Sequence, residues 1–346
     1  MNIPTVTYNG LSFINLNTPT EEEVKFLNKT FGFSMLNLED YLYKTQIPKI
    51  ETYKDYSLVV LDIPFIPQPG KVKKETGGNK FFFLPNVLSN RVPLPVFPKT
   101  PRKKRISIGE VDFFLGDDYI VVLHDEKTPQ IDELFEICKL NDKHREDLMS
   151  KGPVYLFYRI VDILVDSSFT YVEDIGNTID YIDRQLEERS SPALIEDISM
   201  TRRNIVVFET MIKPSLPIFA DLERGKYKEL NGDMVPYWSN ILDHLQKIWD
   251  RLEDSKELIV GISESHESYL TQKTNQIIAI LTIVFTYSLP ATVLGTFFGM
   301  NVFLPGGIEV GAWKFWGNYT TFILILIAAI IPTILMHIYF KRKGWV

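Results

Sequence analysis

The sequence predicts an α+β soluble domain followed by a long stalk helix that continues into the first of two C-terminal membrane helices. Three observations support this fold class. Segments that alternate like strands all end before residue 125. A helical pattern without proline occupies residues 237–289. Residues 276–340 contain only two charged side chains, Glu309 and Lys314, and therefore suit a lipid environment.

Residues 1–152 are expected to form an α/β domain. Thr18 is predicted to cap a helix that has Pro19 at its first position, because the segment resembles a capping box. The Gly116-Asp117-Asp118 segment is expected to turn between the last two strands, and Thr128-Pro129 to begin a second helix. The predicted strands are 11–16, 56–63, 106–115 and 118–124.

Residues 153–275 are predicted to be helical and to end in the stalk. One helix is expected to begin at Ser191-Pro192 and to end near Lys213-Pro214, because proline interrupts helices. A later helix is expected to run from about Met234 to about Asn301. At 1.5 Å per residue its length would be roughly 100 Å.

So long a helix needs partners along its side. Mostly apolar side chains recur along the stalk every three or four residues, and this seam favours a symmetric oligomer around a central axis. The seam consists of Ile241, Leu245, Ile248, Leu252, Ser255, Ile259, Ile262, His266, Tyr269 and Lys273.

Two uncharged runs near the C-terminus are each long enough to cross a bilayer as a helix. Lys273 precedes the first run and Lys341-Arg342-Lys343 follows the second, so the positive-inside rule places both chain ends in the cytoplasm. A buried hairpin of a soluble protein is the alternative. The predicted segments are a first membrane helix at 276–301, an outer loop at 302–318, a second membrane helix at 319–340 and a basic tail at 341–346.

One face of the first membrane helix carries a stripe that includes polar side chains at steps of three or four residues. A single hairpin cannot enclose a water path, so the stripe suggests several copies around an axis, each lining a pore. The alternative is that the threonine hydroxyls bond back to their own helix. Pro290 lies within this helix. The stripe consists of Asn275, Ile278, Thr282, Phe285, Leu289, Thr292, Thr296 and Gly299.

Acidic side chains on the stalk are expected mainly to form a solvated surface. Asp243, Glu257 and Glu264 are also candidates for holding a regulatory metal ion.

Residues 64–105 form a basic insertion, with eight of the 20 prolines and ten Lys or Arg against one acid, Glu75. This insertion is expected to be a mobile, solvated segment outside the folded domain, with a short strand at 81–84. Contact with anionic lipid headgroups is the alternative.

Composition excludes several classes of protein. The net charge is −7, and the tail's three positive charges leave −10 on the first 275 residues, which disfavours nucleic acids and suits cations as partners. The single cysteine, Cys138, excludes disulfides and a Cys-rich zinc site. No secretory signal begins the chain, so its soluble part is expected in the cytosol. No nucleotide or hydrolase motif occurs, and the His124-Asp125 and Asp243-His244 pairs are expected to be structural.

The end of the first membrane helix, Gly299-Met300-Asn301, resembles the CorA family of divalent-cation channels. Thr274-Asn275-Gln276, Leu281-Thr282 and Pro290 precede the triplet at the family's spacing. The tail at 339–345 and two N-terminal segments, at 17–23 and 48–53, are also similar to the family. The resemblance covers nearly the whole chain except most of the 64–105 insertion.

The resemblance implies a funnel-shaped homopentamer in the cell (inner) membrane, with the first membrane helix lining the pore. Gly299, Met300 and Asn301 would ring the outer mouth. Neutral amide and carbonyl oxygens there could accept hydrogen bonds from a hydrated Mg²⁺, which dehydrates reluctantly. Asn275, Ile278, Leu281 and Phe285 would lie toward the cytosolic end and form a hydrophobic gate, with Leu281 where the stripe places Thr282. The membrane potential would drive uptake without ATP.

The resemblance also implies regulation by cytosolic Mg²⁺, and passage of Co²⁺ and Ni²⁺. In the family a regulatory carboxylate commonly lies three residues before an Asp-His pair, and here that position is Asn240. Glu309 is the only carboxylate of the outer loop, which leaves a zinc transporter of the same fold, the ZntB-like branch, as an alternative. A membrane-anchored sensor that never conducts is the third hypothesis.

Overall fold

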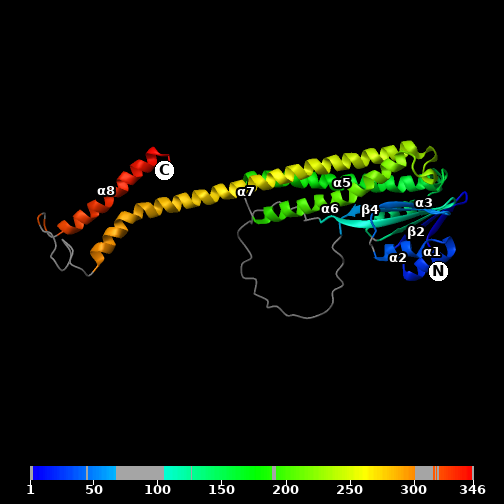
Figure 1. The fold of residues 1–346 in the computed structure, drawn as a ribbon, viewed down its shortest axis with the longest axis horizontal. Helices are drawn as coiled ribbons and strands as arrows, with labels where there is room; N and C mark the ends of the chain where they lie inside the picture. Colours follow the sequence, from blue (N-terminus) through cyan, green and yellow to red (C-terminus); the bar gives the residue numbers. More distant parts are fainter. Residues whose placement is uncertain are drawn as a thin grey trace, which may run out of the picture. The chain divides into compact units, whose positions relative to one another are not determined.

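The computed structural model describes residues 3–43, 46–67, 105–125, 127–188, 192–300, 315, 317 and 319–344 (Figure 1). The N-terminal elements are β1 (Thr5–Tyr8), β2 (Leu11–Asn17), α1 (Glu21–Phe31), α2 (Met35–Tyr43), β3 (Lys49–Thr52), β4 (Ser57–Phe65), β5 (Ser107–Leu115), β6 (Tyr119–His124), α3 (Pro129–Leu140) and α4 (Asp142–Met149). The later elements are α5 (Pro153–Glu188), α6 (Pro192–Glu223), the 3₁₀ turns η1 (Lys228–Leu230) and η2 (Gly232–Met234), α7 (Val235–Gly299) and α8 (Thr320–Arg342).

The six strands form one sheet in the order β1-β2-β6-β5-β4-β3, and β2 with β6 is its parallel pair. One face packs against α1 and α2, and the other packs against α3, α4, α5 and α6 (Figure 1). The central strands β4 and β5 are therefore buried on both faces, which explains their nearly continuous apolar sequences. The four predicted strands are confirmed, and β1 and β3 add an edge strand at each side. The expected strand at 81–84 lies outside the described residues.

The first helix begins two residues later than the sequence suggested. Thr20, rather than Thr18, is the N-cap. Its hydroxyl accepts from the Glu23 backbone N–H at 3.3 Å, and the Glu23 carboxylate accepts from the Thr20 N–H at 2.7 Å. Thr18 instead has a positive φ of 52°, so it belongs to the turn that leaves β2. The reciprocal pair decides the start because it satisfies two backbone donors at once.

Helix α6 does not end at Pro214 as predicted. It continues to Glu223 with Pro214 and Pro217 inside it. Each proline removes one backbone hydrogen bond, but the same stretch contributes a mostly apolar face to the core. The buried members of that face include Met211, Ile212, Ile218, Phe219 and Leu222. Burial of five large side chains offsets the lost hydrogen bonds.

Helix α7 confirms the predicted long helix, with 65 residues from Val235 to Gly299. The interpretation of its seam is wrong, however. The apolar seam residues from Ile241 to Ile262 lie in the same buried cluster as residues of α5 and α6, and the polar seam residues Ser255 and His266 are buried as well. Three antiparallel helices of one chain therefore use the seam for their own packing, and it is not available to a second copy. Tyr269 and Lys273, at the end of the predicted seam, are exposed.

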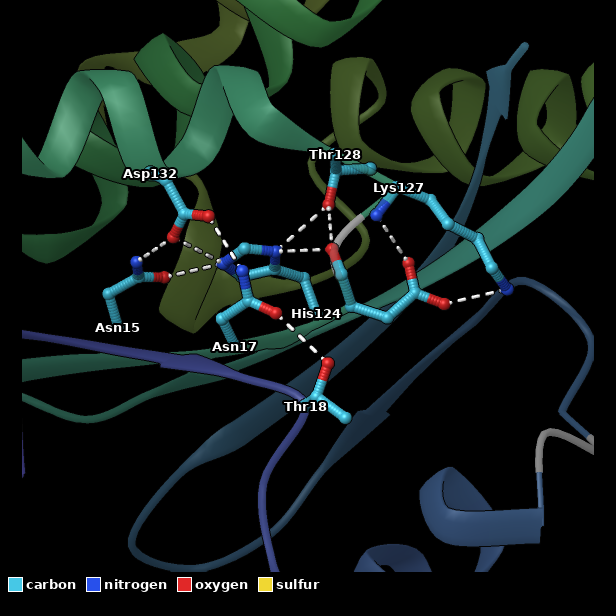
Figure 2. A network of polar contacts seen from close by, with 8 residues as sticks. Asn15, Asn17, Thr18, His124, Lys127, Thr128 and Asp132 are labelled. Atoms are coloured by element: carbon cyan, nitrogen blue, oxygen red, sulfur yellow. Dashed lines mark hydrogen bonds and ion pairs between the residues drawn. The ribbon is translucent and has the colours of Figure 1, made fainter. Parts of the chain in front are cut away.

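A polar network ties α3 to the carboxyl ends of β2 and β6 (Figure 2). The Asp132 carboxylate accepts hydrogen bonds from the side-chain amides of Asn15 and Asn17, each at 2.7 Å. His124 is fully buried between them, with Nε2 at 2.9 Å from Asn15 Oδ1 and Nδ1 at 3.0 Å from the Thr128 hydroxyl. The adjacent pair His124-Asp125 is thus structural, as expected.

A second buried ionisable group, Asp112, lies on β5 at the centre of the sheet. It is fully buried. Gln46 Nε2 donates to its Oδ2 at 3.0 Å, and its Oδ1 has no hydrogen-bond partner among the described residues. Burial, together with the nearby Glu110 carboxylate, raises the pKa of Asp112 well above its usual value.

We predict that Asp112→Asn stabilises the protein at pH 8. The folded wild type binds more protons than the unfolded chain above about pH 3.9, so its free energy of unfolding falls as pH rises. The neutral amide of Asn does not titrate, so the variant does not lose stability in this way. We expect its free energy of unfolding to exceed that of the wild type by about 1 kcal/mol at pH 8 and by less toward pH 5. Urea unfolding followed by circular dichroism measures it. Asp117→Asn, on the exposed turn, is the control, and a destabilised Asp112→Asn at pH 8 would contradict the account.

His124 predicts the opposite pH dependence. Burial lowers the pKa of its imidazole, so the folded protein binds fewer protons than the unfolded chain below about pH 6.5. The free energy of unfolding should fall as pH drops through that range. We expect His124→Gln to have a shallower pH slope between 7 and 5 in urea titrations. His144→Gln, at an exposed position on α4, should keep the wild-type slope, and equal slopes in all three proteins would disprove the assignment.

Candidate functional site

Helices α7 and α8 each contain a segment long and apolar enough to cross a membrane. Neither apolar segment is buried inside the chain. This exposure distinguishes them from the core helices of a soluble protein and argues against the buried-hairpin alternative. Large apolar side chains such as Val284, Phe297, Phe322 and Ile331 face outward over both helices. The expected pair of C-terminal membrane helices is therefore present.

The predicted stripe on α7 stays exposed in the single chain. Phe285 and Leu289 are 70% and 57% exposed, and Ile278 and Leu281 are both more than half exposed. Leu281 and Thr282 are neighbours on the helix, and both are exposed. Their exposure is therefore compatible with either residue as the member of the stripe. The remaining stripe positions, Asn275, Thr292, Thr296 and Gly299, are exposed as well.

The threonine hydroxyls of the stripe donate back to their own helix. Thr282 bonds to the Ile278 carbonyl at 2.8 Å, Thr292 to Ser288 at 2.9 Å and Thr296 to Thr292 at 2.8 Å. This is the local alternative considered for these residues. It uses only the hydroxyl proton, so each oxygen keeps a lone pair that could accept a hydrogen bond from water.

Helix α8 contacts the opposite side of α7. The Tyr287 hydroxyl lies 3.1 Å from His337 Nδ1, and the Thr333 hydroxyl donates to the Tyr287 carbonyl at 3.3 Å. At 100° per residue, Tyr287 lies about 160° around the helix from Phe285 and from Leu289. One face of α7 thus meets α8, and the other carries the stripe.

The C-terminal end of α7 is formed by Gly299. Met300 follows it, with its N–H donating to the Phe297 carbonyl at 3.3 Å and its side chain about half exposed. A Cβ on Gly299 would meet no atom within 4 Å in the single chain. Asn301 and Glu309 lie outside the described residues. The role predicted for the Gly299-Met300-Asn301 triplet therefore stays a prediction.

The other end of the stripe opens into a shallow polar groove on α7. Its volume is about 800 Å³. Glu264 lies at one end and Asn275 near the other, so the groove extends the stripe with carboxylate, hydroxyl and amide side chains. Its lining residues are Glu264, Glu267, Ser268, Thr271, Gln272, Asn275, Gln276 and Ala279.

A separate group of potential metal ligands joins α5 to α7. The ligand atoms of Asp162, Asp166 and His244 all lie within 4.8 Å of one another. His244 Nδ1 is 3.2 Å from an Asp166 carboxylate oxygen. Arg159 donates to Asp162 at 3.0 Å, and the Asn240 amide is 3.5 Å from the same carboxylate. Burial raises the pKa of Asp162, and the Asp166 charge adds to the effect.

Sequence reasoning missed this cluster. Within the described part of the chain, the predicted candidates Asp243, Glu257 and Glu264 join no such group of three. The spacing of Asp162 and Asp166, four residues apart on one helix, was the available signal. Only the pairing of α5 with α7 brings His244 to them, and no local pattern reports that pairing. His244, expected to be structural, is therefore a candidate ligand.

Similarity to known proteins covers most of the chain. The family model described as CorA-like Mg²⁺ transporter protein matches residues 91–342. The cobalt/magnesium transport protein CorA of Thermotoga maritima is 25% identical over 345 residues, covering 97% of this chain and 86% of that protein. A more distant relative, the zinc transport protein ZntB of Yersinia enterocolitica, is 23% identical over 63% of each chain.

The fold agrees with a solved structure of a full-length relative. The CorA magnesium transporter from Methanocaldococcus jannaschii superposes with a TM-score of 0.72, at 18% identity, covering 99% of this chain and 94% of that one. At this identity the match establishes the fold, with its N-terminal α/β domain, long helix and two C-terminal apolar helices. With the family model matching well over half of the residues, the chain belongs to the CorA-like Mg²⁺ transporter family, a family of divalent-cation transporters rather than enzymes.

Proposed function

We propose that this protein is a passive uptake channel for Mg²⁺, which also passes Co²⁺ and Ni²⁺, in the cell (inner) membrane. The observation that carries the proposal is the division of α7 into two faces. Its stripe is exposed, and α8 contacts the opposite side through Tyr287. Copies arranged around an axis, as a homopentamer, would turn the stripes toward one another and enclose a water path with the lipid bilayer outside.

The mouth of this pore would select the hydrated ion. Mg²⁺ keeps an octahedral shell of water and dehydrates reluctantly. A ring of Asn301 amide oxygens with Gly299 carbonyls and Met300 beside them could accept hydrogen bonds from that shell. Neutral oxygens suit conduction because binding must be weak enough to permit release. Glu309 would add one carboxylate per copy in the outer loop.

The pore would narrow toward its cytosolic end. Ile278, Leu281 and Phe285 are large, apolar and exposed on the stripe side, so rings of them could exclude water when close together. Both termini would be cytoplasmic, because Lys341 and its basic neighbours follow α8. A membrane potential of 100 mV contributes about 2.3 kcal/mol per charge, which would drive a divalent ion inward without ATP.

Cytosolic cations would regulate the channel through Asp162, Asp166 and His244. These side chains join α5 to α7, the helix that carries the stripe, so an ion bound there would favour one arrangement of the two helices. Asp162 and Asp166 offer carboxylate oxygens suited to Mg²⁺. The Arg159 guanidinium at 3.0 Å from Asp162 competes with any ion, which fits a weak site that responds to changing concentration.

A zinc transporter is the second candidate, and a specific observation favours it. The imidazole of His244 beside two carboxylates is a mixed nitrogen and oxygen donor set, which suits Zn²⁺, Co²⁺ and Ni²⁺ better than Mg²⁺. Zn²⁺ flux that persists in a large excess of Mg²⁺ would favour this candidate over the first.

We predict that Asn301→Ala abolishes Mg²⁺ uptake while the oligomer survives. Without the amide ring the mouth has no side-chain acceptors for the water shell, and we expect flux into proteoliposomes to fall by at least about tenfold. Asn318→Ala, in the same connecting segment, is the matched control. Size-exclusion chromatography checks assembly. Wild-type flux through Asn301→Ala would overturn the selectivity proposal.

We also predict that divalent cations stabilise the protein through the α5–α7 cluster. A ligand that binds only the folded state raises the free energy of unfolding by about 2.7 kcal/mol at 100 times its dissociation constant. Melting temperatures with and without Mg²⁺ or Zn²⁺ should show a shift that Asp162→Asn and Asp166→Asn each remove.

Asp243→Asn is the control for that experiment, because Asp243 is exposed and adjacent to His244 in sequence. Loss of the shift in Asp243→Asn but not in Asp166→Asn would place the site where the sequence first suggested. Loss of the Zn²⁺ shift alone in His244→Ala would favour the zinc candidate.

A further inference from the structure

An ionisable side chain lies within the second membrane helix. His337 is the only ionisable group in residues 320–340 apart from the tyrosine near their end. Polar side chains at membrane depth are costly and usually serve a function with an identifiable partner. Here the partner is Tyr287 of α7, whose hydroxyl lies 3.1 Å from His337 Nδ1 and whose ring also approaches Phe340.

A second contact reinforces the first at the level of the backbone. The single hydroxyl proton of Thr333 is shared between the Tyr287 carbonyl at 3.3 Å and the Ala329 carbonyl of its own helix at 3.0 Å. Tyr287 therefore contacts α8 through both its side-chain hydroxyl and its main-chain carbonyl. The two contacts come from residues four apart on α8, which face the same direction.

Both helices are weakened where they meet. Pro290 follows Tyr287 by three residues, and Pro332 immediately precedes Thr333. Each proline removes one backbone hydrogen bond and loosens its helix at that turn. In a membrane, neighbouring helices and threonine hydroxyls commonly stabilise such turns. The contact thus lies at the point where α7 is easiest to bend or rotate.

The contact also opposes the stripe. Ile278 and Thr296 are each nine residues from Tyr287, which is two and a half turns, so they lie directly across the helix from it. Fixing Tyr287 against α8 fixes the direction in which these residues point. A rotation of one residue, about 100°, would exchange Thr282 for Leu281 on the facing side.

We propose that Tyr287, His337 and Thr333 form a positioning contact that sets the rotation of α7 about its axis and so keeps the stripe turned toward the ion path. This inference rests on the proposed function, since the stripe is the proposed pore lining. In this proposal His337 and Tyr287 do not contact the ion. They act through the helix that does, by tying its outward face to α8.

The direct test measures rotation without any ion. Cys138 is buried, so a cysteine introduced as Thr296→Cys is the accessible thiol on α7, and its labelling rate by a water-soluble thiol reagent reports how far the stripe faces water. An interhelical hydrogen bond in a membrane contributes about a factor of three to such an equilibrium. We expect Tyr287→Phe to lower the labelling rate of full-length protein in liposomes by up to about that factor, the full factor applying when the facing state is the minor one.

Matched variants separate the hydrogen bond from general packing. Tyr339→Phe removes a hydroxyl from an exposed tyrosine of α8 and should leave the labelling rate unchanged. His337→Leu should act like Tyr287→Phe, and the double variant should be no worse than either single one. His337→Asn can offer an oxygen or N–H near the Nδ1 position and should restore much of the wild-type rate.

Ion flux through the same variants completes the test. If Mg²⁺ flux falls with the labelling rate, the positioning contact controls the proposed pore. Labelling that responds in a protein that carries no divalent cation would overturn the proposed function and leave the contact intact. Unchanged labelling and flux in both Tyr287→Phe and His337→Leu would overturn the contact.

Discussion

The need to satisfy polar groups within lipid governs the rest of this structure. The hydrocarbon core offers no water to the backbone, so the chain can cross it only as helices that bond internally. The side chains of α7 follow the same constraint, since the hydroxyls of Thr282, Thr292 and Thr296 bond back to their helix. The amide of Asn275, at the start of the stripe, is exposed and is left to bond with water or with another copy. In the proposed channel the exposed stripe is therefore the part of α7 that other copies would cover.

The packing of α5, α6 and α7 restricts where copies in the proposed assembly could meet. The seam from Ile241 to Ile262 packs against α5 and α6. Contact between copies must then involve other surfaces, and the exposed stripe on the same helix is the clearest. The same helices bring Asp162 and Asp166 of α5 beside His244 of α7, where the proposed regulatory cation would bind.

Periodicity identified the elements whose signal is local. The long helix, the central strands and the membrane segments follow from patterns within one segment, and all were predicted. The predicted start of the first helix was wrong because Thr18 and Thr20 are both suitable N-cap residues. Only the reciprocal hydrogen bonds between Thr20 and Glu23 decide between them. The predicted end of α6 at Pro214 was wrong because burial of its apolar side chains in the core outweighs the backbone hydrogen bond that the proline removes. The Asp162, Asp166 and His244 cluster depends on helix pairing across 78 residues, and no local pattern contains that information.

The central claim is that α7 lines a path for hydrated divalent cations. The most direct measurement is Mg²⁺ uptake by proteoliposomes containing the full chain, with the membrane potential set inside-negative and then reversed, and with Zn²⁺ and Co²⁺ compared side by side. The account predicts Mg²⁺ uptake that rises with the inside-negative potential and needs no ATP or proton gradient. Absence of uptake for every divalent cation, or uptake that depends on a proton gradient and ignores the potential, would contradict it.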